Sequence, residues 1–445
     1  MNRSSVEIKP GYELEDCVIL GKIGHGKMAE VFKAIQIIVP RPDLKRLVDL
    51  LLRTSTIEHQ LIQDFRRLER LQKVDKIEFL PEIKDLKGEI TKLKEKLSRG
   101  NPVHNTSDVE SITAQSGLSS YVRLVAAKYL SYERANSKEE NITLEDFEKE
   151  MRLHSLLNHE NIVQVYRSVR TRDGLWIIEE LVDGTDLNSI LGDQRRMETQ
   201  PEPLDPLVVL SIGYYAALGL DHIHSRGVVN RDIKPENMIV GYTGGAIKIA
   251  DFGSAERYYP DSDEFQTSDV FSTSLAYASP MIMDCADFNA AGEFVGMKPG
   301  KKIILDPRDD IYSLGVTMYK LLAARLPFVS PSGRGDHLVY LIRKGKTNSL
   351  RDYNPLITNE IQKIVAKCIK RDPKKRYQTA RELASDISNY LRKGGILLAE
   401  YKSVIHDFMR YAREEREHFY HRSTSEVMEQ SVEDTSVGRV DDSRG

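Results

Sequence analysis

The chain has 445 residues, of which 40% are hydrophobic and 29% are charged, and its formal net charge is −3. This length allows a core of two lobes with additional segments, and a charge so close to zero does not favour binding to nucleic acid. Its three cysteines are widely spaced and odd in number, which argues against a disulfide framework or a zinc site and predicts a reducing, cytoplasmic compartment.

Residues 1–14 are mostly polar and predict an N-terminal tail without the apolar stretch of a signal peptide. Between Cys17 and Ala34, apolar residues alternate around Gly24 and Gly26, which predicts two strands joined by a turn. Because glycine has no Cβ, backbone N–H groups in such a turn can approach a phosphate closely. Two glycines at this spacing are weak evidence by themselves.

A long segment, residues 40–121, separates the second strand from the next one. Its apolar residues follow an interrupted stripe over 44–68 and a regular 3-4 spacing over 83–97, which predicts a helical hairpin or a short coiled coil. Two interpretations are open: the helices bury each other on the surface of a lobe, or residues 41–98 form an arm for self-association or for a partner. Basic and acidic residues are interleaved here, so we expect a solvated face and not a nucleic-acid site.

The next elements carry a lysine and a group of carboxylates. Residues 122–130 predict a strand with Lys128 near its end, and residues 144–157 have the apolar spacing of a helix. A further apolar strand is predicted from Leu175 onwards. A lysine at the end of a strand is usually a surface residue, but the acidic helix that follows offers it a partner.

Residues 204–225 predict a buried helix that ends before Gly227. Its apolar run, Leu207–Leu220, is shorter than the roughly 18 residues that a membrane helix needs, so we expect no membrane association.

The most informative stretch is Val228–Val240, where two short apolar runs flank a polar loop. A strand–loop–strand arrangement places Asp232 and Asn237 at one rim of a sheet, and Asp251 ends the next predicted strand. Two carboxylates and an amide oxygen suit Mg²⁺ bound together with phosphates. The alternative for each residue is a charged surface turn.

The order Arg-Asp-Ile-Lys-Pro-Glu-Asn, followed at the right distance by Asp-Phe-Gly, resembles eukaryotic-type (Hanks-type) serine/threonine protein kinases, the bacterial members in particular. The resemblance covers residues 15–35 and 122–392. It implies an α+β bilobal fold, with a small lobe of five strands and one helix and a large, mostly helical lobe. The implied parts are a kinase domain at 15–392, divided into lobes at 15–183 and 184–392, with a helical insertion at 40–121.

The resemblance also implies the chemistry: transfer of the γ-phosphoryl group of Mg-ATP to Ser/Thr hydroxyls of protein substrates, with autophosphorylation in the activation segment. Asp232 would orient the substrate hydroxyl and accept its proton, and Lys234 would neutralise the transferring group. Asn237 and Asp251 would bind the metal ions. A lysine two residues after the aspartate resembles Ser/Thr-directed kinases.

On the nucleotide side, Lys128 would hold the α- and β-phosphates and pair with Glu150, with Glu148 as the alternative partner. Glu180 to Val182 would form the hinge that holds adenine, and Asp186 could bond the ribose. The implied nucleotide-contacting positions are Ile23, Gly24, His25, Gly26, Lys27, Ala29, Val31, Ala126, Lys128, Glu180, Val182, Asp186 and Ile239.

Several positions depart from the family pattern. Asn230 replaces a histidine that ties the catalytic loop to Asp-Phe-Gly, Glu179 stands at a usually apolar position, and Ala29 replaces a third glycine. We expect Glu179 either to pair with a buried donor or to reflect a register error of one residue, and Asn230 still to bond backbone. Asn230, Glu179 and a further departure at Met281 support an alternative function, a catalytically weak pseudokinase that acts as a scaffold through its insertion and C-terminal helix. A small-molecule phosphotransferase is a third possibility.

The resemblance gives further expectations for the large lobe. Ser274 would lie near the substrate hydroxyl, and Asp310 would brace the catalytic loop. Arg376 lacks its usual glutamate, because Met281 stands there, and an acid from the long Asp284–Asp309 stretch is the candidate substitute. Arg231 would pair with a phosphate in the activation segment, and the candidate acceptors are Thr267, Ser268, Ser272 and Thr273.

The C-terminal part shows one more apolar stripe, within residues 393–420. We expect this amphipathic helix to pack on the large lobe, with partner binding as the alternative. Residues 421–445 are polar and rich in serine and acids, which predicts a disordered tail.

Overall fold

The computed structural model describes most of the chain outside the long insertion and the two ends. The described residues are Ile8, 12–25, 29–37, 122–135, 143–196, 202–259, 267–268 and 273–412. The predicted insertion helices at 40–121 and the predicted tail at 421–445 lie outside them, as do Gly26, Lys27 and Ser272. The chain divides into two compact units, Met1–Met151 with Val165–Leu181 and Arg152–Gln164 with Val182–Gly445.

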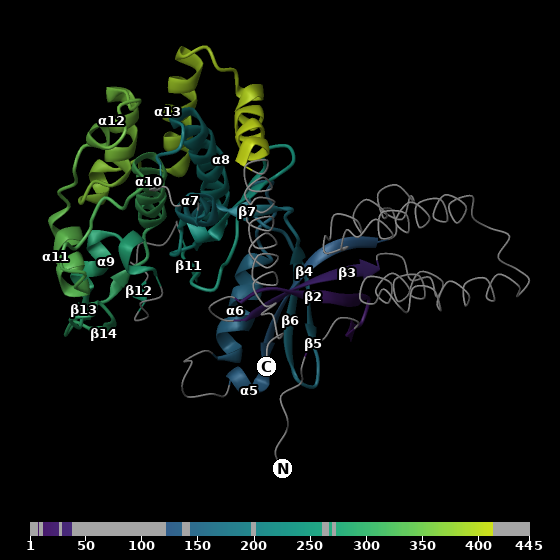
Figure 1. Ribbon diagram of the computed structural model, residues 1–445. Helices are drawn as coiled ribbons and strands as arrows, with labels where there is room; N and C mark the ends of the chain where they lie inside the picture. Colours follow the sequence, from purple (N-terminus) through teal and green to yellow (C-terminus); the bar gives the residue numbers. More distant parts are fainter. Residues whose placement is uncertain are drawn as a thin grey trace, which may run out of the picture. The chain divides into compact units, whose positions relative to one another are not determined.

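The first unit contains an antiparallel sheet with the strand order β1-β2-β3-β4-β6-β5 (Figure 1). Its strands are β1 (Glu13–Leu14), β2 (Cys17–His25), β3 (Glu30–Ile37), β4 (Val122–Ser131), β5 (Val165–Arg170) and β6 (Gly174–Glu180). The prediction of five strands was wrong by one, because β1 pairs with β2 inside the segment that was expected to be a tail.

The two faces of this sheet carry different apolar clusters because side chains alternate along each strand. Trp176 is fully buried on one face and stacks on Tyr129, with 4.3 Å between the ring centroids. On the other face, Leu130 and Ile177 pack with Phe147 of helix α6 (Leu144–His154). A second helix, α5 (Tyr132–Ala135), follows β4 directly, so the small lobe has one helix more than predicted.

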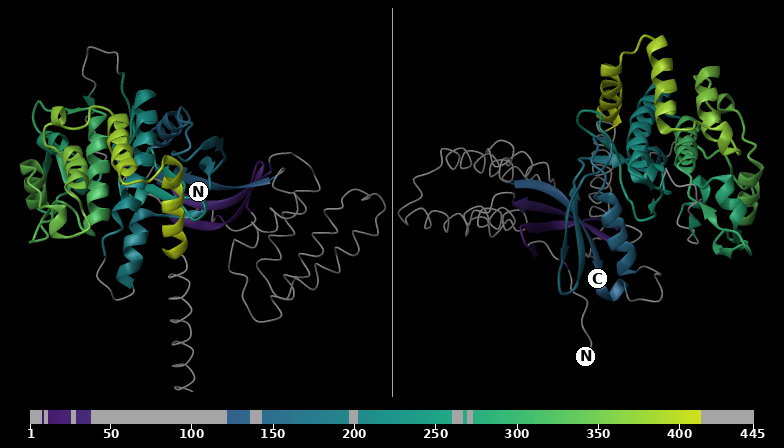
Figure 2. Two further views of the ribbon diagram at one scale, coloured as in Figure 1. Left: turned by 90° about the horizontal axis from the view of Figure 1, so that it is seen from above. Right: turned by 180° about the vertical axis from the view of Figure 1, so that it is seen from behind.

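The second unit is mostly helical, and Figure 2 shows its helices from two further sides. Its helices are α7 (Leu187–Arg196), α8 (Pro206–Ser225), α9 (Pro280–Cys285), α10 (Arg308–Ala323), α11 (Gly335–Lys344), α12 (Asn359–Cys368) and α13 (Ala380–Lys393). The central helix α8 packs against α10 and α13. Among the helices that the structure describes, only α8 is long and apolar enough to cross a membrane. Of the 18-residue apolar part of this helix, 72% is buried inside the protein, as in a core helix.

The start and end of α8 follow from its flanking residues. Asp205 caps its N-terminus by accepting hydrogen bonds from the N–H groups of Leu207 and Val208. Pro206 occupies the first turn, where a missing N–H costs little. After the helix, Gly227 adopts φ 67°, a left-handed conformation that glycine tolerates. The chain can therefore turn directly into the polar loop.

Short strands hold the loops of the second unit. A three-stranded sheet has the order β10-β9-β7, and three two-stranded ladders pair β11 with β8, β12 with β15, and β13 with β14. The bounds are β7 (Gly184–Asp186), β8 (Val228–Val229), β9 (Met238–Gly241), β10 (Ile247–Ile249), β11 (Glu256–Arg257), β12 (Thr267–Ser268), β13 (Ala286–Phe288), β14 (Phe294–Met297) and β15 (Ile303–Ile304). The second unit also contains single turns of 3₁₀-helix, namely η2 (Pro235–Asn237), η3 (Leu275–Tyr277), η4 (Leu350–Asp352), η5 (Pro373–Lys375) and η6 (Leu398–Glu400).

The C-terminal amphipathic helix packs on the second unit over the part that the structure describes, residues 401–412. Tyr401, Ile405 and Met409 are fully buried in the core of this unit. Tyr401 meets Tyr214 of α8 edge to face, with 5.1 Å between the ring centroids. The expectation that this stripe covers the large lobe is confirmed for these residues.

Candidate active site

The loop between β8 and β9 is anchored to the buried helix α10 by one carboxylate. Asp310 has no exposed surface, and its Oδ2 accepts hydrogen bonds from the N–H of Asn230 at 2.9 Å and from His224 Nε2 at 2.8 Å. Its Oδ1 accepts from the N–H of Arg231 at 2.8 Å. Arg231 has φ 68°, which is strained for a residue with a side chain, and these bonds help to hold it there. The predicted brace is confirmed, and His224 is a member of it that the sequence did not reveal.

The carboxylate of Asp232 accepts hydrogen bonds from three residues. Its Oδ1 accepts from the backbone N–H and the hydroxyl of Ser274, at 3.1 and 2.9 Å. Its Oδ2 accepts from Lys234 Nζ at 2.6 Å and from Asn237 Nδ2 at 3.0 Å. Lys234 also donates to the hydroxyl of Ser274 at 2.9 Å. The structure thus gathers these predicted residues into one cluster, and hydrogen bonds of this kind fix the orientation of a catalytic base.

The residues proposed for the metal are linked through the backbone. The N–H of Ala250 donates to the carbonyl of Asn237 at 2.9 Å, which sets Asp251 next to the loop. Asp251 has φ 60°, and its Oδ1 accepts from the N–H of Gly253 at 3.1 Å.

The chemistry of this donor set fits Mg²⁺. Because the amide nitrogen of Asn237 is bonded to Asp232, the amide oxygen is the atom left for a cation. Carboxylate and amide oxygens are hard ligands, and Mg²⁺ is typically held by one or two of them with phosphates and water completing its shell. No group of three or more His, Cys, Asp or Glu residues that could hold a metal ion occurs in the part of the chain that the structure describes.

The first unit contributes a buried ion pair. Lys128 Nζ lies 2.5 Å from Glu150 Oε1, and the two residues are 6% and 2% exposed. Glu148, the alternative partner, pairs with Arg170 in a more exposed position. The choice of Glu150 is confirmed. A buried ion pair is weak evidence of a gain in stability, and here it holds the ammonium group of Lys128 in one position.

Four of the predicted nucleotide positions in this unit, Gly24, Val31, Ala126 and Lys128, lie on one face of the sheet. The register sets Val31 beside Lys128, and Ala126 beside Glu179. Gly24 pairs with Val31 across β2 and β3. Glu179 therefore lies on the same face of the sheet as Ala126 and Lys128, as its assignment from the sequence requires. It is only partly buried. Partial exposure removes the large desolvation cost that a sealed carboxylate would have.

The remaining predicted positions are spread over both units. Ile23 is exposed, whereas Ala29 is fully buried against α6. The predicted hinge, Glu180 to Val182, contains the point between Leu181 and Val182 at which the chain passes from one unit to the other. In the second unit, Asp186 lies at the start of α7, where it accepts hydrogen bonds from the N–H and the hydroxyl of Ser189. The remaining residues are Ile239, which pairs with Asp186 across β9 and β7, and His25, whose side chain lies outside the description.

Comparison with known proteins decides the family. The family described as "Protein kinase domain" matches residues 113–387. The chain belongs to the protein kinase family. The matched range begins near the end of the insertion, and the structure shows that β2 and β3, which precede the insertion, complete the same sheet as β4.

Similar kinases come from several bacteria. Serine/threonine-protein kinase PrkC of Bacillus subtilis is 28% identical over 265 residues, which are 60% of this chain and 36% of that protein. PknB of Mycobacterium leprae is 29% identical over 245 residues, 54% of this chain and 35% of that protein. A probable serine/threonine-protein kinase of Streptomyces coelicolor is 34% identical over 247 residues, 54% and 32% of the two chains. This kinase chain thus spans about a third of the length of these relatives.

The departures of this kinase from the family pattern have local replacements. The side chain of Asn230 accepts a hydrogen bond from the N–H of Asp232 at 3.0 Å and donates to the carbonyl of Asp251 at 3.2 Å. The expectation that asparagine still bonds backbone is confirmed. It joins the catalytic loop to the start of Asp-Phe-Gly, which is the link that the histidine provides in the family.

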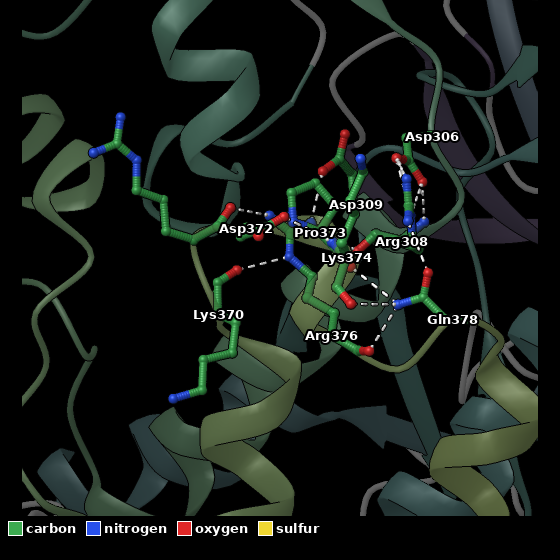
Figure 3. A network of polar contacts seen from close by, with 10 residues as sticks. Asp306, Arg308, Asp309, Lys370, Asp372, Pro373, Lys374, Arg376 and Gln378 are labelled. Atoms are coloured by element: carbon green, nitrogen blue, oxygen red, sulfur yellow. Dashed lines mark hydrogen bonds and ion pairs between the residues drawn. The ribbon is translucent and has the colours of Figure 1, made fainter.

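The arginine left without its usual glutamate also has a substitute (Figure 3). Arg376 Nη1 donates to Asp309 Oδ1 at 2.9 Å, and the arginine side chain is completely buried. Its other donors reach the backbone carbonyls of Arg308, Lys370 and Arg371. Asp309 is the last acid of the Asp284–Asp309 stretch, so the predicted substitution is confirmed.

The candidate phosphate acceptors differ in access. Thr267 is exposed, whereas Ser268 and Thr273 are buried. Arg231 Nη1 donates to the hydroxyl of Ser268 at 3.2 Å and lies 3.5 Å from Glu256 Oε1. The sequence pointed to Arg231 and gave Ser268 as one of four candidate acceptors, but it gave no indication that Glu256 is part of this group.

Proposed function

We propose that this chain is an active serine/threonine protein kinase that uses Mg-ATP. The observation that carries the proposal is the Asp232 carboxylate, which Ser274, Lys234 and Asn237 hold in one orientation. The same lysine is typical of Ser/Thr-directed members of the family, and the similar bacterial proteins are named as such kinases.

The reaction assigns a task to each residue of this cluster. A Ser or Thr hydroxyl of the substrate donates its hydrogen to Asp232, its oxygen forms a bond to the γ-phosphorus, and the bond from that phosphorus to the oxygen of ADP breaks. Lys234 offsets the negative charge on the transferring group. Mg²⁺, held by Asn237 and Asp251, would neutralise phosphate oxygens. In the first unit, Lys128 supplies the cation for the α- and β-phosphates, and Glu150 keeps its ammonium group in place.

An assay of purified protein with labelled ATP tests the proposal. Asp232→Asn keeps the size of the side chain and removes the base, so phosphorylation of itself and of a generic Ser/Thr substrate should fall by roughly 10²- to 10⁴-fold. Asp287→Asn, an exposed aspartate of β13, is the matched control and should keep wild-type activity. If the Asp232 variant is as active as the wild type, Asp232 is not the base. If the wild type and the Asp232 variant are both inactive yet bind ATP, the chain is a pseudokinase scaffold.

Autophosphorylation in the activation segment forms part of this proposal, with Thr267 as the acceptor. Among the candidate hydroxyls that the structure describes, that of Thr267 is the exposed one. Mass spectrometry of protein incubated with Mg-ATP should find the phosphate there, and Thr267→Ala should remove it. Phosphate confined to Ser268 or Thr273 would contradict this assignment.

We also propose that residues 41–98 mediate self-association or partner binding and that the protein is cytoplasmic. The first part depends on the sequence pattern alone, because these residues lie outside the description. Support for a reducing compartment comes from the three free cysteines. Light scattering of the protein with and without residues 41–120 tests the arm, and the same monomer mass in both would exclude self-association.

A further inference from the structure

Arg231 connects two parts of the activation segment, defined here as residues 251–281. Its side chain is buried, and Nη1 contacts Glu256 Oε1, near the start of the segment, and the hydroxyl of Ser268, in its middle. Glu256 lies in β11, which pairs with β8 directly before the catalytic loop. One guanidinium group therefore ties the segment to the loop that carries Asp232.

The surroundings of this arginine are already rich in negative charge. Burial lowers the pKa of Arg231, and the nearby carboxylates of Glu256, Asp310 and Asp309 act in the opposite direction. A phosphate group would bring a further charge of about −1.5 to −2 into this space. Glu256 already places a carboxylate 3.5 Å from Arg231 Nη1, so a phosphate would have to share this arginine with an acid of the chain itself.

A second contact holds the middle of the segment. β12 pairs with β15, with Thr267 opposite Ile304 and Ser268 opposite Ile303. Ile303 is buried in the core of the second unit, so the ladder joins the segment to a fixed point. β15 belongs to the long stretch between α9 and α10 that the sequence marked as unusual.

We propose that Glu256 and β15 hold the activation segment in place of a phosphate, so that this kinase is active without phosphorylation of that segment. Glu256 is a positioning residue: it acts on the reaction through Arg231 and the loop that bears Asp232. The inference depends on the proposed kinase function, whereas the order of the segment can be measured without it.

The first measurement is activity. Wild-type protein co-expressed with a phosphatase, and shown by intact mass to carry no phosphate, should phosphorylate a Ser/Thr substrate within about twofold of the untreated rate. Glu256→Gln removes the charge and should lower kcat about tenfold in both preparations, while the KM for ATP stays within about twofold. Glu256→Asp should recover part of the loss. Glu293→Gln, in the turn between β13 and β14, is the matched control and should behave as the wild type.

The second measurement is hydrogen exchange of peptides that contain β12. Phosphate-free wild type and Glu293→Gln should protect these amides equally, and Glu256→Gln should lose the protection. A tenfold loss of activity on dephosphorylation of the wild type, or wild-type exchange in Glu256→Gln, would overturn the inference. A wild type that is inactive in every preparation would refute the proposed function, and exchange would still decide whether Glu256 orders the segment.

Discussion

Replacing Asp309 by asparagine should destabilise the second unit because it leaves a buried arginine without its anion. The Arg376 side chain is 0% exposed and that of Asp309 is 7% exposed, so water cannot replace the lost carboxylate charge. Removing one partner of a buried pair costs about 3–5 kcal/mol. Three backbone carbonyls and the ring of Tyr312, 4.9 Å from the guanidinium carbon, still surround Arg376. We therefore expect the lower end, about 3 kcal/mol.

Urea unfolding followed by far-ultraviolet circular dichroism measures this cost. With a slope of about 3 kcal/mol per molar urea, a loss of about 3 kcal/mol lowers the midpoint by about 1 M. Asp336→Asn is the matched control, because Asp336 pairs with Arg334 on the exposed start of α11 and should hardly move the midpoint. A fall of less than about 0.3 M for Asp309→Asn would show that the carbonyls alone satisfy Arg376, and the explanation given for the missing glutamate would be wrong.

Two further predictions concern the ion pair of Lys128 and a pair of half-buried histidines. Glu150→Gln should raise the KM for ATP about tenfold or more, because it releases the ammonium group of Lys128, whereas Glu148→Gln should leave it unchanged; equal effects would contradict the assigned pairing. Burial is the largest cause that lowers the pKa values of His159 and His222, whose rings stack, from the usual 6.5. As the pH falls through about 6.5, the unfolded chain therefore binds more protons than the folded chain, and the free energy of unfolding decreases. His222→Phe removes one of these groups, so it should reduce the drop in urea midpoint between about pH 7.5 and 5.5.

The catalytic loop could be predicted because its chemistry is local in sequence. Asp232, Lys234 and Asn237 lie within a few residues, and the short strands around them fix their direction. Asp310 and Glu150 lie far from this loop in the sequence, and they were predicted from the resemblance to the kinase family, which places each of them on a helix.

Short pairings could not be predicted in this way. β1 and β12 have two residues each, too few to show an alternating pattern, and their positions depend on partners in β2 and β15. The same reason explains why Glu256 was missed. Its importance comes from its contact with Arg231, which lies 25 residues earlier in the chain, with β9 and β10 between them. Neither residue type nor spacing shows that contact.

Two buried arginines of the second unit, Arg376 and Arg231, follow one physical rule. A buried arginine without a negative partner is costly, so a change that removes the partner must be balanced by another acid nearby. Asp309 supplies the charge for Arg376 where Met281 stands in place of the usual glutamate, and Glu256 stands beside Arg231. Each acid belongs to the chain itself and is present in every molecule. A group that must be added by another enzyme could serve as a switch, whereas a built-in carboxylate keeps the arginine engaged at all times, and this favours a kinase whose control lies outside its activation segment.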